Sequence, residues 1–169
     1  MKTNKILVPL DGSDMAESAI AEACQVAHSE STLLLIRAAN ARIIPGADVI
    51  GTQIIAVREA EEYLAALKSK LEKDGVREIE TQVWYGPAAS AIVEAARAHK
   101  VDLIVMTTHG RSGLGRVVFG SVAESVLRGT TVPILLVRAS GAPVEPPAGR
   151  DEASPVKEGK PTPRAEVLR

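Results

Sequence analysis

A glycine-rich, basic segment is the part of this chain best suited to chemistry. Residues 106–122 read Met-Thr-Thr-His-Gly-Arg-Ser-Gly-Leu-Gly-Arg-Val-Val-Phe-Gly-Ser-Val, between an apolar run and a helical pattern. Glycines let backbone N–H groups approach an anion closely, and the unpaired amides at a helix N-terminus add partial positive charge. Gly110, Gly120 and Ser121 suit such a cradle, and Arg111 adds a guanidinium group for a polyanion. The segment predicts a phosphate-binding loop with a nucleotide as ligand.

Three of the polar side chains in this segment also have ordinary structural interpretations. Arg111 and Arg116 suit a solvated loop equally well, because exposed arginines are common. Ser121 is the residue expected to cap the helix that begins there, with Glu124 completing a capping box, and such a cap is worth about 1 kcal/mol. Capping and phosphate binding are compatible at Ser121, so both roles stay open.

Five runs of apolar, branched residues alternate with helical patterns, which is the rhythm of a parallel sheet covered on both faces. The fold predicted is α/β, a doubly wound five-stranded parallel sheet of the Rossmann-like type with helices on both faces. The five expected strands cover residues 6–10, 33–38, 79–84, 103–107 and 134–137.

Two stretches interrupt this rhythm. Residues 39–54 form a long connection, and loops of that length in compact domains are often lids. Residues 140–169 hold six of the ten prolines and no aromatic residue, so they cannot bury enough surface to fold alone. We expect one nucleotide-binding domain over residues 1–139 and a disordered, proline-rich tail over residues 140–169. A solvated spacer is the simplest role for the tail, and a docking segment is the alternative.

The composition narrows the class of protein. A net charge of −1 gives no global attraction to nucleic acid or to an anionic membrane. The single cysteine, Cys24, has no partner for a disulfide, which fits a reducing cytoplasm. The first apolar run is too short for a secretory signal or a membrane span. We expect a cytoplasmic protein that binds neither nucleic acid nor membrane.

The predicted topology says which residues meet. In an open parallel sheet, ligands bind beyond the carboxyl ends of the strands, where the order of the strands reverses. Residues 9–13, 37–39 and 107–110 are therefore expected on one rim. Asp11 is the natural recognition group there, since its carboxylate could accept hydrogen bonds from a ribose hydroxyl or an exocyclic amine. Its structural alternative is an Asx-turn that stabilises the bend after the first strand.

These residues resemble the universal stress proteins, whose nucleotide-binding members carry the pattern Gly-x2-Gly-x9-Gly-Ser/Thr. Gly110, nine further residues and then Gly120-Ser121 match its second glycine and closing pair, while Thr107 occupies the position of the first glycine. Threonine is costly there if the position needs positive φ, and it fits if the position is an extended strand end. Residues 6–14, the Gly86-Pro87 step and residues 132–137 strengthen a resemblance that covers residues 1–139.

The resemblance implies an adenine nucleotide alpha hydrolase-like domain that binds ATP and Mg²⁺ and serves as a sensor or signalling module in the stress response. It implies that residues after the first two strands surround adenine and ribose, that the end of the fourth strand lines the ribose side, and that the glycine loop holds the phosphates. The magnesium ion is then held mainly by phosphate oxygens, without protein ligands. The expected site residues, of which Arg111 rests on charge alone, are Pro9, Leu10, Asp11, Ala38, Met106, Thr107, Gly110, Arg111, Gly120, Ser121 and Val122.

The resemblance also implies a homodimer that pairs through the last strand, residues 134–137. Catalysis beyond slow ATP hydrolysis is not expected, because residues 111–119 contain no Asp or Glu that could activate a water. Two rival functions remain. One is a protein interaction module of the same fold without nucleotide, motivated by Thr107. The other, more remote, is an adenylating enzyme, motivated by the segment at residues 11–14.

Overall fold

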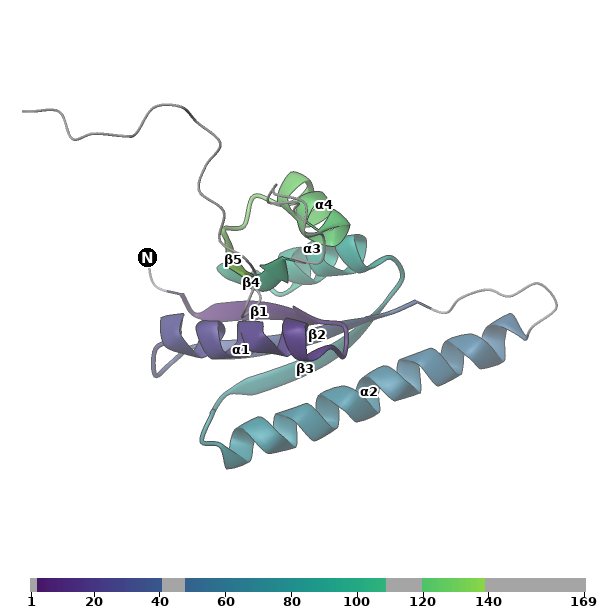
Figure 1. The fold of residues 1–169 in the computed structure, drawn as a ribbon, viewed down its shortest axis with the longest axis horizontal. Coiled ribbons are helices and arrows are strands. Elements are labelled where there is room, and N and C mark those ends of the chain that lie inside the picture. Colours follow the sequence, from purple (N-terminus) through teal and green to yellow (C-terminus); the bar gives the residue numbers. More distant parts are fainter. Residues whose placement is uncertain (1–2, 41–47, 109–119, 139–169) are drawn as a thin grey trace, which may run out of the picture.

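The computed structural model describes residues 3–40, 48–108 and 120–138. Strands and helices alternate along the chain, and all five strands are parallel, in the order β3-β2-β1-β4-β5 (Figure 1). The predicted doubly wound sheet is confirmed. The elements are β1 (Lys5–Leu10), α1 (Asp14–Val26), β2 (Thr32–Ala39), α2 (Val49–Lys73), β3 (Ile79–Tyr85), α3 (Ala88–Ala98), β4 (Leu103–Thr108), α4 (Ser121–Gly129) and β5 (Ile134–Arg138).

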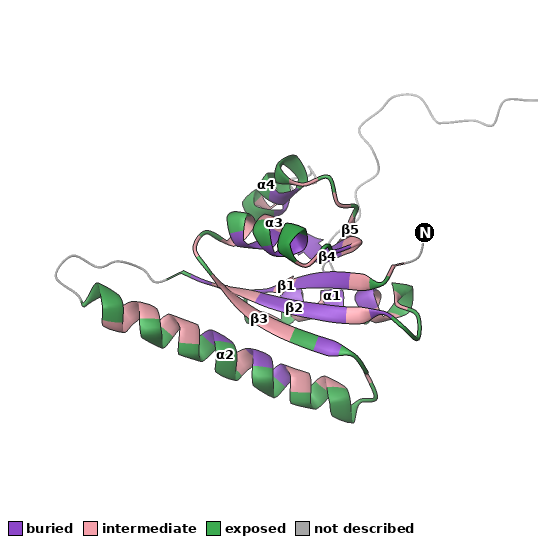
Figure 2. Ribbon diagram, turned by 180° about the vertical axis from the view of Figure 1, so that it is seen from behind, coloured by how far each residue is buried: buried purple, intermediate pink, exposed green. Residues whose placement is uncertain are grey.

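The central strands are buried on both faces, which explains their continuous apolar sequences. Ile6 and Val8 of β1 face the layer formed by α1 and α2, while Leu7 faces the layer formed by α3 and α4. In β2, Leu35 and Ile36 divide in the same way. Figure 2 shows this burial along β1 and β2. The buried sheet thus holds in place the loops that follow the carboxyl ends of its strands.

Helix α2 begins earlier than the sequence indicated. Residues 49–54, predicted as part of a long connection, are helical, and Oδ1 of Asp48 caps the helix by accepting a 3.1 Å hydrogen bond from the Ile50 N–H. The prediction was wrong because it relied on a buried stripe. Ile50 and Ile54 are 71% and 54% exposed, so the first turns carry no amphipathic pattern directed at the core. Residues 41–47 of the predicted lid lie outside the described residues.

At the other end of the sheet, a side chain links the amino ends of two strands. The Oδ2 atom of Asp102, just before β4, accepts hydrogen bonds from the backbone N–H groups of Asn4 and Lys5, each 2.9 Å long. These bonds tie the amino ends of β1 and β4 together, so the two strands begin in register.

β1 and β4 stay paired only at their beginnings. β1 pairs with β2 along its whole length, but its ladder with β4 contains only the pairs Ile6–Leu103 and Leu7–Ile104. β1 is also where the strand order reverses, since β2 follows on one side and β4 on the other. The carboxyl ends of these two strands therefore border a crevice.

Pro9 lies on the crevice side of β1. Thr32 N–H of β2 donates to Asn4 O, whereas Asp102 N–H beside β4 donates to Lys5 O. Because successive residues of a strand direct their backbone groups to alternate neighbours, Pro9, like Lys5, faces β4. Proline has no N–H for a ladder bond, and it is tolerated in this central strand because the pairing with β4 has already ended.

Candidate functional site

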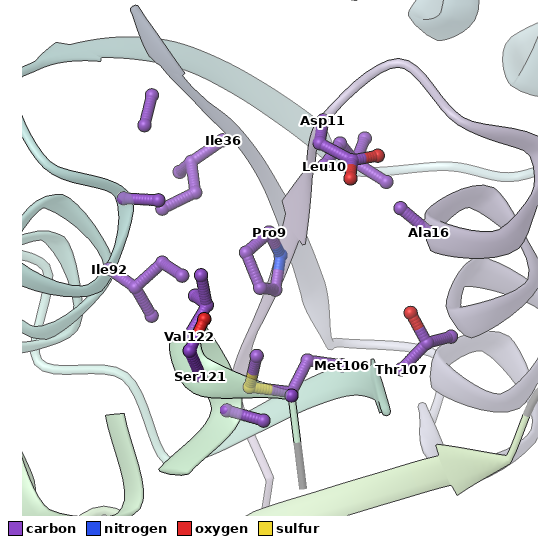
Figure 3. Close-up of a pocket in the computed structure, with 14 residues that line it drawn as sticks. Pro9, Leu10, Asp11, Ala16, Ile36, Ile92, Met106, Thr107, Ser121 and Val122 are labelled. Atoms are coloured by element: carbon purple, nitrogen blue, oxygen red, sulfur yellow. The ribbon is translucent and has the colours of Figure 1, made fainter. Parts of the chain in front are cut away.

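A cavity of about 420 Å³ occupies the crevice beyond β1 and β4. Its walls come from the ends of β1, β2 and β4, the first turn of α1, the N-terminal half of α3 and the start of α4. Figure 3 shows Ile36 and Ile92 on one side of this cavity and Asp11, Ala16 and Thr107 on the other. The size lies in the range of small-molecule sites.

Most of the residues predicted for the site line this one cavity. They come from four segments of the chain, and they are Pro9, Leu10, Asp11, Ala38, Met106, Thr107, Gly120, Ser121 and Val122. The other two predicted residues, Gly110 and Arg111, lie outside the described residues, as does Arg116. The cavity is therefore built where the reversal of strand order predicted a ligand.

The sequence interpretation missed five lining residues, all apolar: Ala16, Ile36, Ala88, Ile92 and Ala123. Ile36 could have been found, because it precedes Ala38 by two residues in β2 and so shares its face of the sheet. Ala88 and Ile92 are four residues apart on one side of α3, but only the tertiary structure places that side at the cavity. The apolar side chains of Ala88 and Ile92 make this wall of the cavity suitable for a flat, apolar ring.

Asp11 forms the Asx-turn that was its structural alternative. Its Oδ1 atom accepts hydrogen bonds from the Ser13 N–H, at 3.0 Å, and from the Ser13 hydroxyl, at 2.6 Å. Oγ of Ser13 in turn accepts a 3.1 Å bond from the Ala16 N–H and is the N-cap of α1. The turn keeps the Asp11 carboxylate at the mouth of the cavity, so the structural role and a recognition role are compatible.

Thr107 occupies the place of the motif's first glycine without backbone strain. It lies within β4, and the only non-glycine residues with positive φ in the described ranges are Glu78 and Lys100. Extended backbone is the conformation that a β-branched residue favours. The position is therefore an extended strand end, and the first glycine is not needed here for its conformational freedom.

The N-terminus of α4 opens into the cavity without a capping side chain among the described residues. The Glu124 N–H donates to Gly120 O at 2.9 Å, which makes Gly120 the N-cap, with φ −55° and ψ 146°. The predicted cap at Ser121 is wrong, because Ser121 is already the first helical residue. The predicted capping box is absent too, and Glu124 instead pairs with Arg128 at 3.0 Å.

An uncapped helix start suits an anion. The first N–H groups of a helix have no intrahelical carbonyl partner and carry partial positive charge. In α4 these groups belong to Ser121, Val122 and Ala123, and all three residues line the cavity. The cavity thus combines an apolar wall with a set of amide donors.

Within residues 3–40, 48–108 and 120–138, no three His, Cys, Asp or Glu side chains are grouped so that they could hold a metal ion. None of the helices in those ranges has both the length and the apolarity needed to cross a bilayer.

Comparison with known proteins gives one consistent match. The model of the Universal stress protein family matches residues 2–138. Universal stress protein MJ0531 of Methanocaldococcus jannaschii is 35% identical over 139 residues, covering 79% of this chain and 81% of that protein.

Two solved structures share the fold. The hypothetical protein MJ0577, whose structure served to assign its biochemical function, superposes with a TM-score of 0.68 at 26% identity, over 82% of this chain and 97% of that one. A universal stress protein in complex with cAMP superposes with a TM-score of 0.57 at 25% identity, over 83% and 100%.

Proposed function

Because the chain belongs to the universal stress protein family, we propose that its cavity binds an adenine nucleotide, with ATP and Mg²⁺ as the ligand. In this proposal the protein is a nucleotide-binding sensor or signalling module of the stress response and at most a slow ATPase. The observation that carries the proposal is the joint presence, in one cavity, of an apolar wall and the first amides of α4, which no side chain of the described residues caps.

The two halves of the cavity suit the two halves of a nucleotide. The adenine ring lies against the apolar side chains of Ile36 and Ile92, and Met106 and Thr107 line the ribose side. The ribose lies near Asp11, whose carboxylate accepts hydrogen bonds from hydroxyl groups. The phosphates lie at the start of α4, where amide donors and the helix dipole stabilise negative charge. Mg²⁺ is held mainly by phosphate oxygens, and Gly110 and Arg111 complete the phosphate side.

The complex of a related universal stress protein with cAMP supports an adenine nucleotide as the ligand class. We propose ATP rather than a monophosphate because Gly120-Ser121 matches the closing pair of the motif from which the sequence implied ATP. The choice among ATP, AMP and cAMP is the first matter for experiment.

The test is the identity of the small molecule that the purified protein carries. Denaturation, chromatography and mass spectrometry would identify it, and calorimetric titration with Mg-ATP, AMP and cAMP would rank affinities. The fluorescence of the single tryptophan, Trp84, gives a second measure of binding. Trp84 on β3 is the strand partner of the cavity residue Ala38 on β2. ATP or ADP near one per chain supports the proposal.

Other outcomes of the same experiment favour the rivals. Protein that is purified empty and fails to bind any added adenine nucleotide would favour an interaction module. ATP turnover of about 1 per second or faster would show an enzyme instead of a sensor. Release of pyrophosphate in the presence of an acceptor would point to adenylation.

Assembly is a separate part of the proposal. β5 is an edge strand of the sheet, and its residues Ile134 to Val137 are only half-buried in the single chain. An apolar edge of this kind invites pairing with another chain, and we expect a homodimer through β5. Light scattering that gives the mass of a monomer at micromolar concentration would refute it.

A further inference from the structure

The guanidinium group of Arg37 lies between the turn after β1 and an aromatic ring of α2. Its Cζ atom is 4.8 Å from the centroid of the Tyr63 ring, within the range of a cation–π contact. On the other side is Gly12, where a Cβ atom would lie 3.4 Å from Nη2 and 3.5 Å from Cζ and Nη1 of Arg37. The guanidinium thus lies beside the turn, where it would make ordinary van der Waals contact with a Cβ at this position.

Gly12 sits between the two partners of the Asx-turn, Asp11 and Ser13. It has φ +87°, a conformation that residues with a Cβ rarely adopt, and the guanidinium of Arg37 lies beside it. The turn is therefore held from within by the two hydrogen bonds from Ser13 to Asp11, and Arg37 covers its outer side.

Tyr63 is itself held in place from α1. Its hydroxyl donates a 2.8 Å hydrogen bond to Oε1 of Glu17. Arg37 comes from β2, Tyr63 from α2 and Glu17 from α1, so three elements converge on the outer side of the turn. Both Arg37 and Tyr63 are half-buried, which limits solvent screening of the contact between the cation and the ring.

We infer that Arg37 is a positioning residue of the nucleotide cavity, which fixes the Asp11–Gly12–Ser13 turn and thereby gives the cavity selectivity for a nucleotide with a ribose 2′-hydroxyl. The inference rests on the proposed function, since it assumes that Asp11 meets the ribose. Arg37 is not among the residues that line the cavity, so it acts through the turn and not on the ligand.

The experiment compares the affinities for Mg-ATP and Mg-2′-deoxy-ATP by calorimetry. We expect the wild-type protein to prefer ATP about tenfold or more, the value of one hydrogen bond to a charged group. The variant Arg37→Met keeps the length of the side chain without the cation, and its preference should fall towards onefold. Arg37→Lys should fall as well, because an ammonium group cannot lie flat between the ring and Gly12.

Variants of Tyr63 separate positioning from general destabilisation. Tyr63→Leu should lose the preference, and Tyr63→Phe should restore most of it, because phenylalanine keeps the ring under the guanidinium. Lys5→Met is the matched control. It breaks the 2.8 Å ion pair with Glu80 near the amino ends of the strands and should change neither affinity. A merely structural role of Arg37 would lower the melting temperature without changing the ratio of the two affinities.

Among the affinities, the inference would be overturned by a wild-type preference near onefold, by an undiminished preference in Arg37→Met, or by equal losses in Tyr63→Phe and Tyr63→Leu. Amide hydrogen exchange at Ser13 in the ligand-free proteins makes failure of the inference distinguishable from failure of the proposed function. Faster exchange in Arg37→Met and Tyr63→Leu than in Lys5→Met supports the positioning of the turn, and unchanged exchange refutes it. Wild-type protein that binds neither nucleotide refutes the proposed function and, with it, the ribose selectivity.

Discussion

The hydroxyl of Tyr63 on α2 donates a 2.8 Å hydrogen bond to Glu17 on α1. Burial, this hydrogen bond and the negative charge of Glu17 raise the pKa of Tyr63 well above its usual value of 10.0, against the opposing effect of Arg37. Tyr63 therefore remains a protonated donor at neutral pH. The contact joins the two helices that cover one face of the sheet, and it orients the ring on which Arg37 lies.

The raised pKa of Tyr63 predicts a loss of stability at alkaline pH. The folded protein holds the phenolic proton more tightly than the unfolded chain, so this contribution is complete below pH 10 and declines as the pH rises above it. Chemical denaturation at a series of pH values should give a free energy of unfolding that falls less steeply above pH 10 in Tyr63→Phe than in the wild type. Parallel curves would contradict the assigned shift.

We expect an acidic residue at Gly120 to have opposite effects on the stability of α4 and on ligand binding. The φ of −55° at Gly120 is accessible to any residue, so Gly120→Asp keeps the fold and adds a capping side chain to α4, with a gain of a few tenths of a kcal/mol. The new carboxylate competes for the amides and repels phosphate, so ATP affinity should fall at least about tenfold. Calorimetry and thermal melting check the two effects.

Gly120→Val provides the matched variant without charge. Its branched side chain should obstruct the approach of phosphate while the melting temperature stays within a few degrees of the wild type. Normal ATP binding by both Gly120 variants would place the phosphate site elsewhere.

We expect that replacing Thr107 by the glycine of the motif brings no gain in ATP binding. The residue is 9% exposed within β4, so Thr107→Gly should lower the free energy of unfolding by about 1–2 kcal/mol through lost packing and strand propensity. ATP affinity should change less than about threefold, because the backbone is already extended. A tenfold tighter complex would show that the threonine side chain obstructs the ligand, and Thr107→Val would then tell whether its hydroxyl is responsible.

We expect the loss of the Asp102 side chain to lower the stability of the protein without affecting the cavity. Asp102→Ala removes the acceptor of two backbone N–H groups at the amino ends of β1 and β4 and should cost about 1–3 kcal/mol in urea denaturation. ATP affinity, measured well below the melting transition, should stay at the wild-type value. A large loss of affinity would show instead that the pairing of β1 and β4 at their amino ends determines the geometry of the cavity at their carboxyl ends.

Much of the candidate site could be predicted because parallel strands place their carboxyl ends together. That rule predicted that Asp11, Ala38 and Thr107 lie at one end of the sheet, although they are widely separated in the chain. The opposite wall could not be predicted, since nothing in the pattern of α3 says that Ile92 faces the crevice. The helix start at Val49 escaped prediction for a related reason, because its exposed first turns carry no periodic signal from the core.

By itself, the sequence determined the type and order of the elements and the family, because apolar runs buried on both faces and the spacing of Gly110 and Gly120-Ser121 are local patterns. The tertiary structure alone decided that Gly120 and not Ser121 caps α4, since a cap is defined by which carbonyl accepts the first helical bond. It likewise decided that Thr107 is unstrained and that the guanidinium of Arg37 lies beside Gly12. Both depend on the meeting of β1, β2 and β4, which no local pattern describes.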